Sequence, residues 1–290
     1  MVNIPKLQGS KFLIAGAGGG FDIFGGIPLA SALIESTDIV LASFSLKSQG
    51  FKIRKSTKED YPEGELAVEI PVYTFGKNGV QNLRDAYEEV IRTHNIDTVI
   101  LVDGGVDSLM VGDEENAGTI LEDFISLAAV DQLNVPNKYL VCVGFGTEVE
   151  ENLNHYRVLE NIAALSKSGG FLGSCSLTRG DICYWNYDTC CKLAWINGRK
   201  SHIHTRIIPA VEGDFGYKSI ECDAQVTNAS KEPVFVSPLS SIYWFFNLPE
   251  VVKRNLMIPK IAMSRTFTDA MMLFRQNMIK PTRSKEHIPL

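Results

Sequence analysis

The stretch GAGGGFDIFGGIP, residues 16–28, decides how this chain folds. It follows the apolar run FLIA at 12–15 and leads into a helical pattern that begins near Pro28. A strand, a glycine-rich loop and a helix in this order bring backbone N–H groups close to a ligand. Because glycine has no Cβ atom, such a loop can turn tightly against a bound molecule. Four glycines are the predicted ligand contacts of this loop: Gly16, Gly18, Gly19 and Gly20.

The same loop also restricts the kind of ligand. The dinucleotide fingerprint G-x-G-x-x-G is not met, because Phe21 stands where the third glycine would be. Asp22 adds a carboxylate, and an anion beside a phosphate is unfavourable without a cation between them. We therefore expect a nucleotide- or sugar-sized ligand, with Asp22 on a hydroxyl group or a metal ion. A plain strand-to-helix turn is the alternative.

Apolar runs alternate with helical patterns over the first half of the chain. Continuous apolar runs at 38–43, 97–102 and 138–143 predict buried strands, and the spacing of apolar residues predicts helices at 80–93 and 114–133. The pair Thr147 and Glu150 has the capping-box spacing and predicts the start of a helix that runs to about residue 167. Such alternation predicts an α/β fold with a mostly parallel, doubly wound, Rossmann-like sheet.

We expect three regions along the chain. Residues 1–178 form the Rossmann-like, ligand-binding core, and residues 179–279 form an α-rich portion of the same domain that closes over the strand ends. Residues 280–290 are basic, contain two prolines and are expected to be a flexible tail. The aromatic run 243–246 indicates either core or a dimer interface, so homo-oligomerisation stays open.

Glycine and acidic residues follow three of the predicted strands, at 16–22, 103–107 and 144–148. In doubly wound sheets, ligands bind in the crevice outside the carboxyl ends of the strands, so these loops should line one crevice. Three carboxylates are the candidate catalytic residues: Asp103, Asp107 and Glu148. The other predicted ligand contacts outside the first loop are Gly104, Gly105, Ser108, Gly146 and His202.

Carboxylates crowded in this way suit three kinds of chemistry. Asp22, Asp103 and Asp107 can hold Mg²⁺ or another divalent cation, bind ribose hydroxyls, or share a proton for acid–base catalysis. The acids at 113–115 instead suit a helix N-terminus, where the dipole favours negative charge. His202 and His204 alternate as on a strand, which suits a metal pair. Alternatively, Ser201, His202 and Arg206 contact an anionic group of the substrate.

Three segments together resemble a known family: GAGGGFDIFGGIPL, VDGGVDSLMVGDE and GFGTEVE. The sequence is similar to the DUF1152 family over roughly residues 12–173. The resemblance implies a Rossmann-like sheet and no particular reaction. Where the related pattern has Asp-Gly-Glu near the third loop, this sequence reads Gly146-Thr147-Glu148, which keeps the acid.

Composition sets the remaining limits. The net charge of -6 argues against a nucleic-acid partner, and no run approaches the roughly 20 apolar residues that a membrane span needs. The first residues lack the apolar core of a signal peptide, so a cytoplasmic protein is expected. The favoured function is hydrolysis or group transfer on a nucleotide, nucleoside or sugar phosphate. An NAD(P)-dependent oxidoreductase and a non-catalytic metabolite-binding protein are the alternatives.

Overall fold

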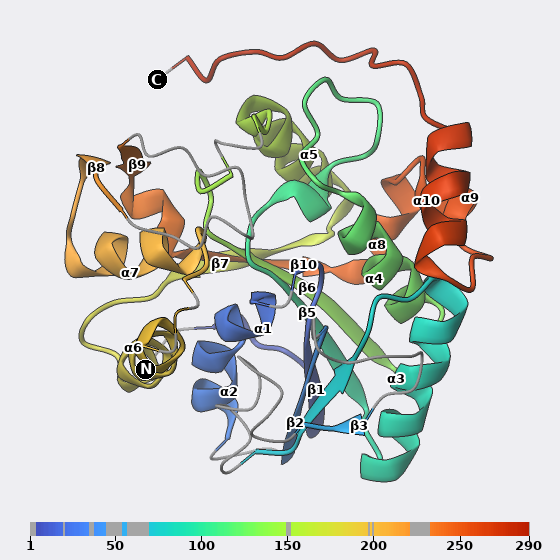
Figure 1. Cartoon of the computed structure of the whole chain (residues 1–290), viewed down its shortest axis with the longest axis horizontal. Helices are drawn as coiled ribbons and strands as arrows, with labels where there is room; N and C mark the ends of the chain where they lie inside the picture. Colours follow the sequence, from blue (N-terminus) through green and yellow to red (C-terminus); the bar gives the residue numbers. More distant parts are fainter. Residues whose placement is uncertain are drawn as a thin grey trace.

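The computed structural model describes residues 4–19, 21–34, 38–44, 54–56, 70–148, 152–196, 198, 200–220 and 233–289. Within these residues the main element is an eight-stranded sheet with helices on both faces (Figure 1). The strands, in spatial order, are β3 (Arg54–Lys55), β4 (Val72–Phe75), β2 (Asp38–Phe44), β1 (Lys11–Gly16), β5 (Thr98–Asp103), β6 (Asn137–Val143), β10 (Ile242–Asn247) and β7 (Phe171–Ser176). The predicted α/β class is confirmed.

The centre of the sheet is parallel and doubly wound. Strands β4, β2, β1, β5 and β6 pair in parallel, while β3 and β10 run antiparallel to their neighbours. From β1 the chain continues to β2 on one side, whereas from β5 it continues to β6 on the other side. The direction of winding therefore reverses between β1 and β5, and a crevice for ligands is expected at such a switch point.

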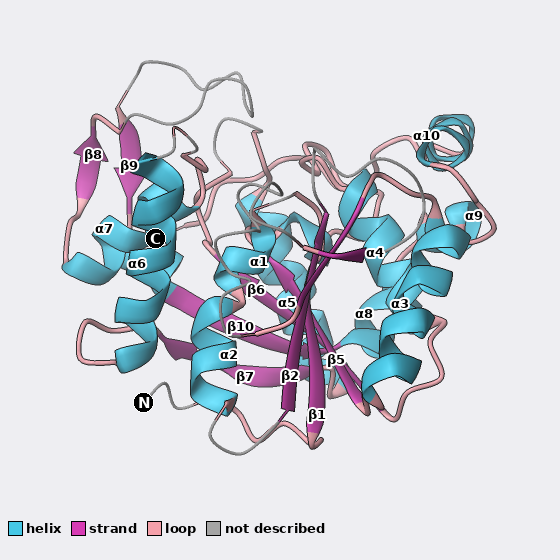
Figure 2. Cartoon of the chain, turned by 60° about the horizontal axis from the view of Figure 1, so that its bottom comes forward, coloured by secondary structure: helices cyan, strands magenta, loops and turns pink. Residues whose placement is uncertain are grey.

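Each central strand is apolar on both faces because each face is covered by helices. Alternate residues of β1 and β5 enter two separate hydrophobic clusters, with Leu13 and Leu101 in one and Ile14 and Ile100 in the other. One cluster packs against α3 (Val80–His94), α4 (Leu121–Asp131), α5 (His155–Ser168), α8 (Leu248–Arg254), α9 (Ile258–Ile261) and α10 (Phe267–Gln276). The other packs against α1 (Asp22–Gly25), α2 (Ile27–Leu33), α6 (Ile182–Ile196) and α7 (His204–Glu212) (Figure 2).

The C-terminal part is helical and also contributes a strand to the main sheet. Strand β10 contains the aromatic run, lies between β6 and β7, and places Phe245 and Phe246 in the two cores. A second sheet of two short strands, β8 (Gly216–Lys218) and β9 (Val234–Val236), lies beside α7 (Figure 1). Near the C-terminal end, the guanidinium of Arg283 pairs with Asp113, Glu114 and Glu160.

Two helix starts were predicted wrongly. The helix expected from residue 114 begins at Leu121, because Asn116 and Gly118 have positive φ angles of 60° and 83° that a helix cannot accommodate. Glu114 is therefore not at a helix N-terminus; its carboxylate accepts the N–H groups of residues 111–113. The helix expected to start at Thr147 is α5, which begins at His155 with Asn154 as its N-cap.

None of the helices within the described residues has the length and apolar character needed to cross a membrane.

Candidate functional site

The three loops that carry glycine and acid meet at one edge of the sheet. Strands β1, β5 and β6 are neighbours and parallel, so their carboxyl ends lie side by side at the switch point. Two backbone–side-chain bonds connect the loops. Asp22 from the first loop accepts a hydrogen bond from the Gly104 N–H of the second. Glu148 from the third accepts one from the Val106 N–H of the second, at 2.6 Å. The prediction that these loops converge is confirmed.

Asp103 and Asp107 are held by the segment that follows β5. Asp103 ends the strand, and its carboxylate accepts hydrogen bonds from both the N–H and the hydroxyl of Ser108. Asp107 begins the short 3₁₀ helix η2 (Asp107–Leu109), and its carboxylate accepts the Thr119 N–H at 2.8 Å. Both side chains are buried, with 3 % of their surface exposed. Ser108, predicted to contact a ligand, positions Asp103.

A third carboxylate, Asp123, completes this group and was not among the residues predicted from the sequence. Single oxygens of Asp103, Asp107 and Asp123 lie within 4.8 Å of one another, and all three side chains are buried. We call these three residues the acidic triad. Asp123 is 5 % exposed, and no residue in the described part of the chain donates a hydrogen bond to its carboxylate. An unbonded, buried carboxylate is costly unless a proton or cation accompanies it.

Asp22 lies beside the triad and ties the loops together. Its carboxylate accepts the Gly18 N–H at 2.7 Å and also the Gly104 N–H. The amide of Gly18, predicted to bind the ligand, is therefore engaged within the loop. Asp22 also begins helix α1, whose four residues are all buried.

Close backbone packing accounts for the glycines around the carboxylates. At four positions an added Cβ atom would approach a carboxylate oxygen to between 2.6 and 2.8 Å, closer than side chains tolerate. The pairs are Gly18 with Asp123, Gly104 with Asp22, Gly105 with Glu148, and Gly118 with Asp107. These glycines allow carboxylates to lie directly against the backbone, which packs the acids more tightly than any other residue type would allow.

The crowding of acids has a clear electrostatic effect. Burial raises the pKa of the Asp123 carboxyl well above its ordinary value, and the charges of Asp107, Asp103 and Asp22 raise it further. Burial and the charge of Asp103 likewise raise the pKa of Asp22, against the two amide hydrogen bonds that favour its ionised form. A site with this character attracts positive charge, in the form of protons or a cation.

The expected pair of histidines on a strand was wrong. His204 is the first residue of helix α7, and His202 lies in the turn before it. His204 bridges two elements: its Nε2 donates to the Phe21 carbonyl at 2.7 Å, and its Nδ1 accepts from the Tyr187 hydroxyl at 2.7 Å. Burial lowers the pKa of His204 to about 4, so the ring is neutral at pH 7. His204 thus fixes the glycine loop from the C-terminal part of the chain.

Helix α7 also brings a cation to the third loop. The guanidinium of Arg206, which is 2 % exposed, donates to the carbonyl of Thr147, the residue before Glu148. Gly146 in this loop has a φ of 87° and open space around its Cα atom.

Of the other glycines predicted in the first loop, Gly20 lies outside the described residues. Gly16 packs on the backbone of Ile23, and a Cβ atom on Gly19 would meet only Asp22, at 3.9 Å.

The sequence contains one signal that could have revealed Asp123. It lies on the inner face of α4, between the buried residues Ile120 and Leu127 at spacings of three and four. A carboxylate on the apolar face of a helix is unusual, because burying its charge is costly, and such a residue is a candidate for a functional site. The helix at 114–133 was predicted from its apolar residues alone, so the acidic residue on the same face was overlooked.

The fold and the site define a doubly wound α/β protein with a buried acidic centre at its topological switch point. The model of a family described as "Protein of unknown function (DUF1152)" matches residues 63–283, and the chain belongs to this family. The matched residues include the acidic triad and Glu148, while the glycine loop at 16–28 precedes them. No curated protein matches the chain.

Proposed function

We propose that this protein is an enzyme that depends on a divalent cation and acts on a small phosphate-bearing molecule by hydrolysis or group transfer. The observation that carries the proposal is the acidic triad: three buried carboxylates within 4.8 Å, one of them without a hydrogen bond from the described residues. Oxygen ligands from carboxylates are those that Mg²⁺ and Ca²⁺ prefer.

In this proposal each neighbouring group has a role. Asp103, Asp107 and Asp123 hold the cation, whose charge offsets that of the carboxylates and of a substrate phosphate. Ser108 and Thr119 orient the first two carboxylates through the hydrogen bonds described above. Glu148, buried at the adjacent strand end, is the candidate general base. Asp22 maintains the junction between the first and second loops.

The contacts of Gly18 disfavour the oxidoreductase alternative. In dinucleotide-binding folds the second glycine of the fingerprint lets the backbone approach the pyrophosphate. Gly18 occupies that position here, but its N–H is bonded to Asp22 and its Cα atom faces the carboxylate of Asp123. Two carboxylates at this place would repel a pyrophosphate that has no cation beside it.

Calorimetric titration with MgCl₂ and MnCl₂ tests the metal site. We expect one cation to bind to the wild type, and Asp103→Asn, Asp107→Asn and Asp123→Asn each to abolish binding while the protein stays folded. Asp85→Asn is the matched control, because Asp85 is an exposed acid on α3, and it should bind the cation normally. Binding that survives Asp123→Asn would refute the triad as the metal site.

Turnover is tested separately. Release of inorganic phosphate from a panel of phosphate esters should require Mg²⁺, stop in EDTA and resume when Mg²⁺ is restored. Glu148→Gln should bind the cation but lose turnover by a factor of about 10² or more, since a general base contributes about that much. Cation binding without any turnover across the panel would instead support a non-catalytic metabolite-binding protein.

A further inference from the structure

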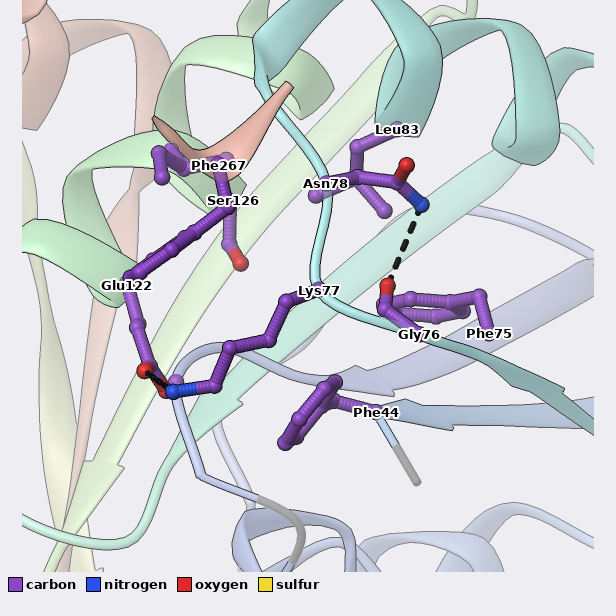
Figure 3. Close-up of a pocket in the computed structure, with 11 residues that line it drawn as sticks. Phe44, Phe75, Gly76, Lys77, Asn78, Leu83, Glu122, Ser126 and Phe267 are labelled. Carbon is purple, nitrogen blue, oxygen red and sulfur yellow. Dashed lines mark hydrogen bonds and ion pairs between the residues drawn. The ribbon is translucent and has the colours of Figure 1, made fainter. Parts of the chain in front are cut away.

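A pocket lies at the carboxyl ends of β1, β2 and β4 (Figure 3), and two shared elements connect it with the acidic triad. Gly18 belongs to both places, because it lines the pocket and its Cα atom faces the carboxylate of Asp123. Helix α4 is also shared: Glu122 and Ser126 line the pocket, and Asp123 belongs to the triad. A ligand in the pocket would therefore lie beside the cation site.

The walls of the pocket are largely aromatic. Phe44 at the end of β2, Phe75 at the end of β4 and Phe267 at the start of α10 line it together with Leu83 and Ile125. The space between these walls amounts to about 280 Å³, a volume that includes the part open to solvent. Aromatic side chains bind planar ring systems by stacking, so the chemistry of these walls suits a planar ring.

One cation stands at the pocket. Among the described lining residues, Lys77 alone carries positive charge, and its ammonium lies 2.5 Å from the carboxylate of Glu122 (Figure 3). The same ammonium lies 5.6 Å from the ring centroid of Phe44 and 4.8 Å from that of Phe267. The side chains of Lys77 and Glu122 are 44 % and 30 % exposed, so this ion pair is accessible to solvent. Replacing Glu122 by another anion as the partner of Lys77 therefore costs little free energy.

We propose that the pocket binds the planar ring of the substrate and that Lys77 exchanges Glu122 for the substrate's phosphate. This proposal rests on the proposed function and narrows its substrate to molecules that join an aromatic ring to a phosphate, as nucleoside monophosphates do. Stacking on Phe44 and Phe267 recognises the ring, and the ammonium of Lys77 together with the cation on the triad neutralises the phosphate. A sugar phosphate without a ring would leave the aromatic walls uncovered.

The test compares three probes by calorimetry in Mg²⁺: adenosine 5′-monophosphate, ribose 5-phosphate and adenosine. The nucleotide should bind at least tenfold more tightly than either of the other two. Phe44→Leu should weaken nucleotide binding at least fivefold and leave ribose 5-phosphate unchanged, since stacking contributes about 1 to 3 kcal/mol per base. Phe267→Leu gives the same comparison through a different wall should Phe44→Leu fail to fold. Phe235→Leu, a change in the separate β8–β9 sheet, is the matched control.

Lys77→Gln separates the phosphate contact from the ring contact. It should weaken the nucleotide and ribose 5-phosphate about tenfold or more and leave adenosine unchanged, while Lys253→Gln on α8 should change none of them. Equal affinity for the nucleotide and ribose 5-phosphate would overturn the pocket proposal even if Mg²⁺ binds to the triad. Nucleotide binding that depends on Phe44 and Lys77 but persists in EDTA would support the pocket and refute the cation-dependent function.

Discussion

Gly18 is the residue at which the acidic triad and the backbone are most tightly packed. A methyl group at this position would lie 2.7 Å from one oxygen of Asp123, so Gly18→Ala must displace that carboxylate. We expect at least a tenfold loss of Mg²⁺ affinity in calorimetric titration. Gly19→Ala is the matched control, because its methyl group would meet only Asp22 at an ordinary 3.9 Å, and its affinity should stay within twofold. Equal effects of the two substitutions would place Asp123 away from the cation.

Asp123 itself should reduce the stability of the metal-free protein. Its carboxylate is buried among three like charges without a described hydrogen bond, so Asp123→Asn removes repulsion at little cost in packing. We expect the free energy of unfolding in EDTA to rise by about 1 kcal/mol, as is common when a functional group is neutralised. Urea denaturation measures this change. A loss of 1 kcal/mol or more would show that the carboxylate has a structural role.

The other members of the triad were predictable and Asp123 was not, for a physical reason. Asp103 and Asp107 follow an apolar strand directly, and parallel strands bring such positions to one edge. Asp123 reaches the same place from a helix, through a packing angle that no local pattern encodes. His204 was assigned to a strand because an i, i+2 spacing of two residues cannot distinguish a strand from a turn that enters a helix.

At the scale of elements, the segment after η2 is held in place by the C-terminal end of the chain. Arg283 pairs with Asp113 at 2.6 Å and with the buried carboxylate of Glu114 at 2.5 Å. Burial alone would raise the pKa of Asp113, but hydrogen bonds from Arg283 and Thr282 lower it overall. This segment continues to Thr119, which bonds to Asp107 of the triad.

Arg283→Ala should therefore destabilise the protein and loosen the site. Removing one partner of a buried ion pair leaves the other charge without compensation, and we expect a loss of about 2 to 3 kcal/mol in the free energy of unfolding. Arg275→Ala, an exposed position in the last turn of α10, is the control and should change it by less than 0.5 kcal/mol. Urea denaturation gives both values. If the two variants were equally stable, the terminal segment would not hold the loop.

Strands were predicted better than helix starts because their signals differ in kind. A continuous apolar run such as that of β5 or β6 indicates a strand that is buried on both faces, and it can be recognised without knowing which elements pack against it. The residue at which a helix starts depends on which of several competing local hydrogen bonds form. The carboxylate of Glu114 accepts the amides of residues 111–113 instead of those of a helix N-terminus, and Asn154 caps α5 in place of Thr147.

At the scale of the whole molecule, the buried His204 and the half-buried His155 should make stability fall in mild acid. Burial lowers the pKa values of His155 and His204 from 6.5 to about 4. Between pH 6.5 and 4 the unfolded chain therefore binds protons at these positions and the folded chain does not. The contribution of each histidine to the free energy of unfolding is therefore fully present above pH 6.5 and is lost as the pH falls to about 4. Each histidine accounts for a loss of about 3 kcal/mol.

His204→Gln isolates one of these contributions. Glutamine cannot titrate but can still donate to the Phe21 carbonyl, and the variant also leaves Tyr187 and His202 in place. The slope of unfolding free energy against pH should fall by up to about 1.4 kcal/mol per pH unit between pH 6.5 and 4. Urea denaturation at several pH values measures it. An unchanged slope would mean that His204 is protonated equally in the folded and unfolded states.

The position of β10 has a consequence for protein synthesis. Strand β7 pairs with β10 in the main sheet, so β7 cannot join that sheet until residues 242–247 have left the ribosome. Until then the nascent chain carries an uncovered edge on β6, whose apolar residues and free backbone groups are a template for association with other chains. Translation that stops before residue 242 would thus release an aggregation-prone fragment, even though the glycine loop and all three strand ends of the site had already been made.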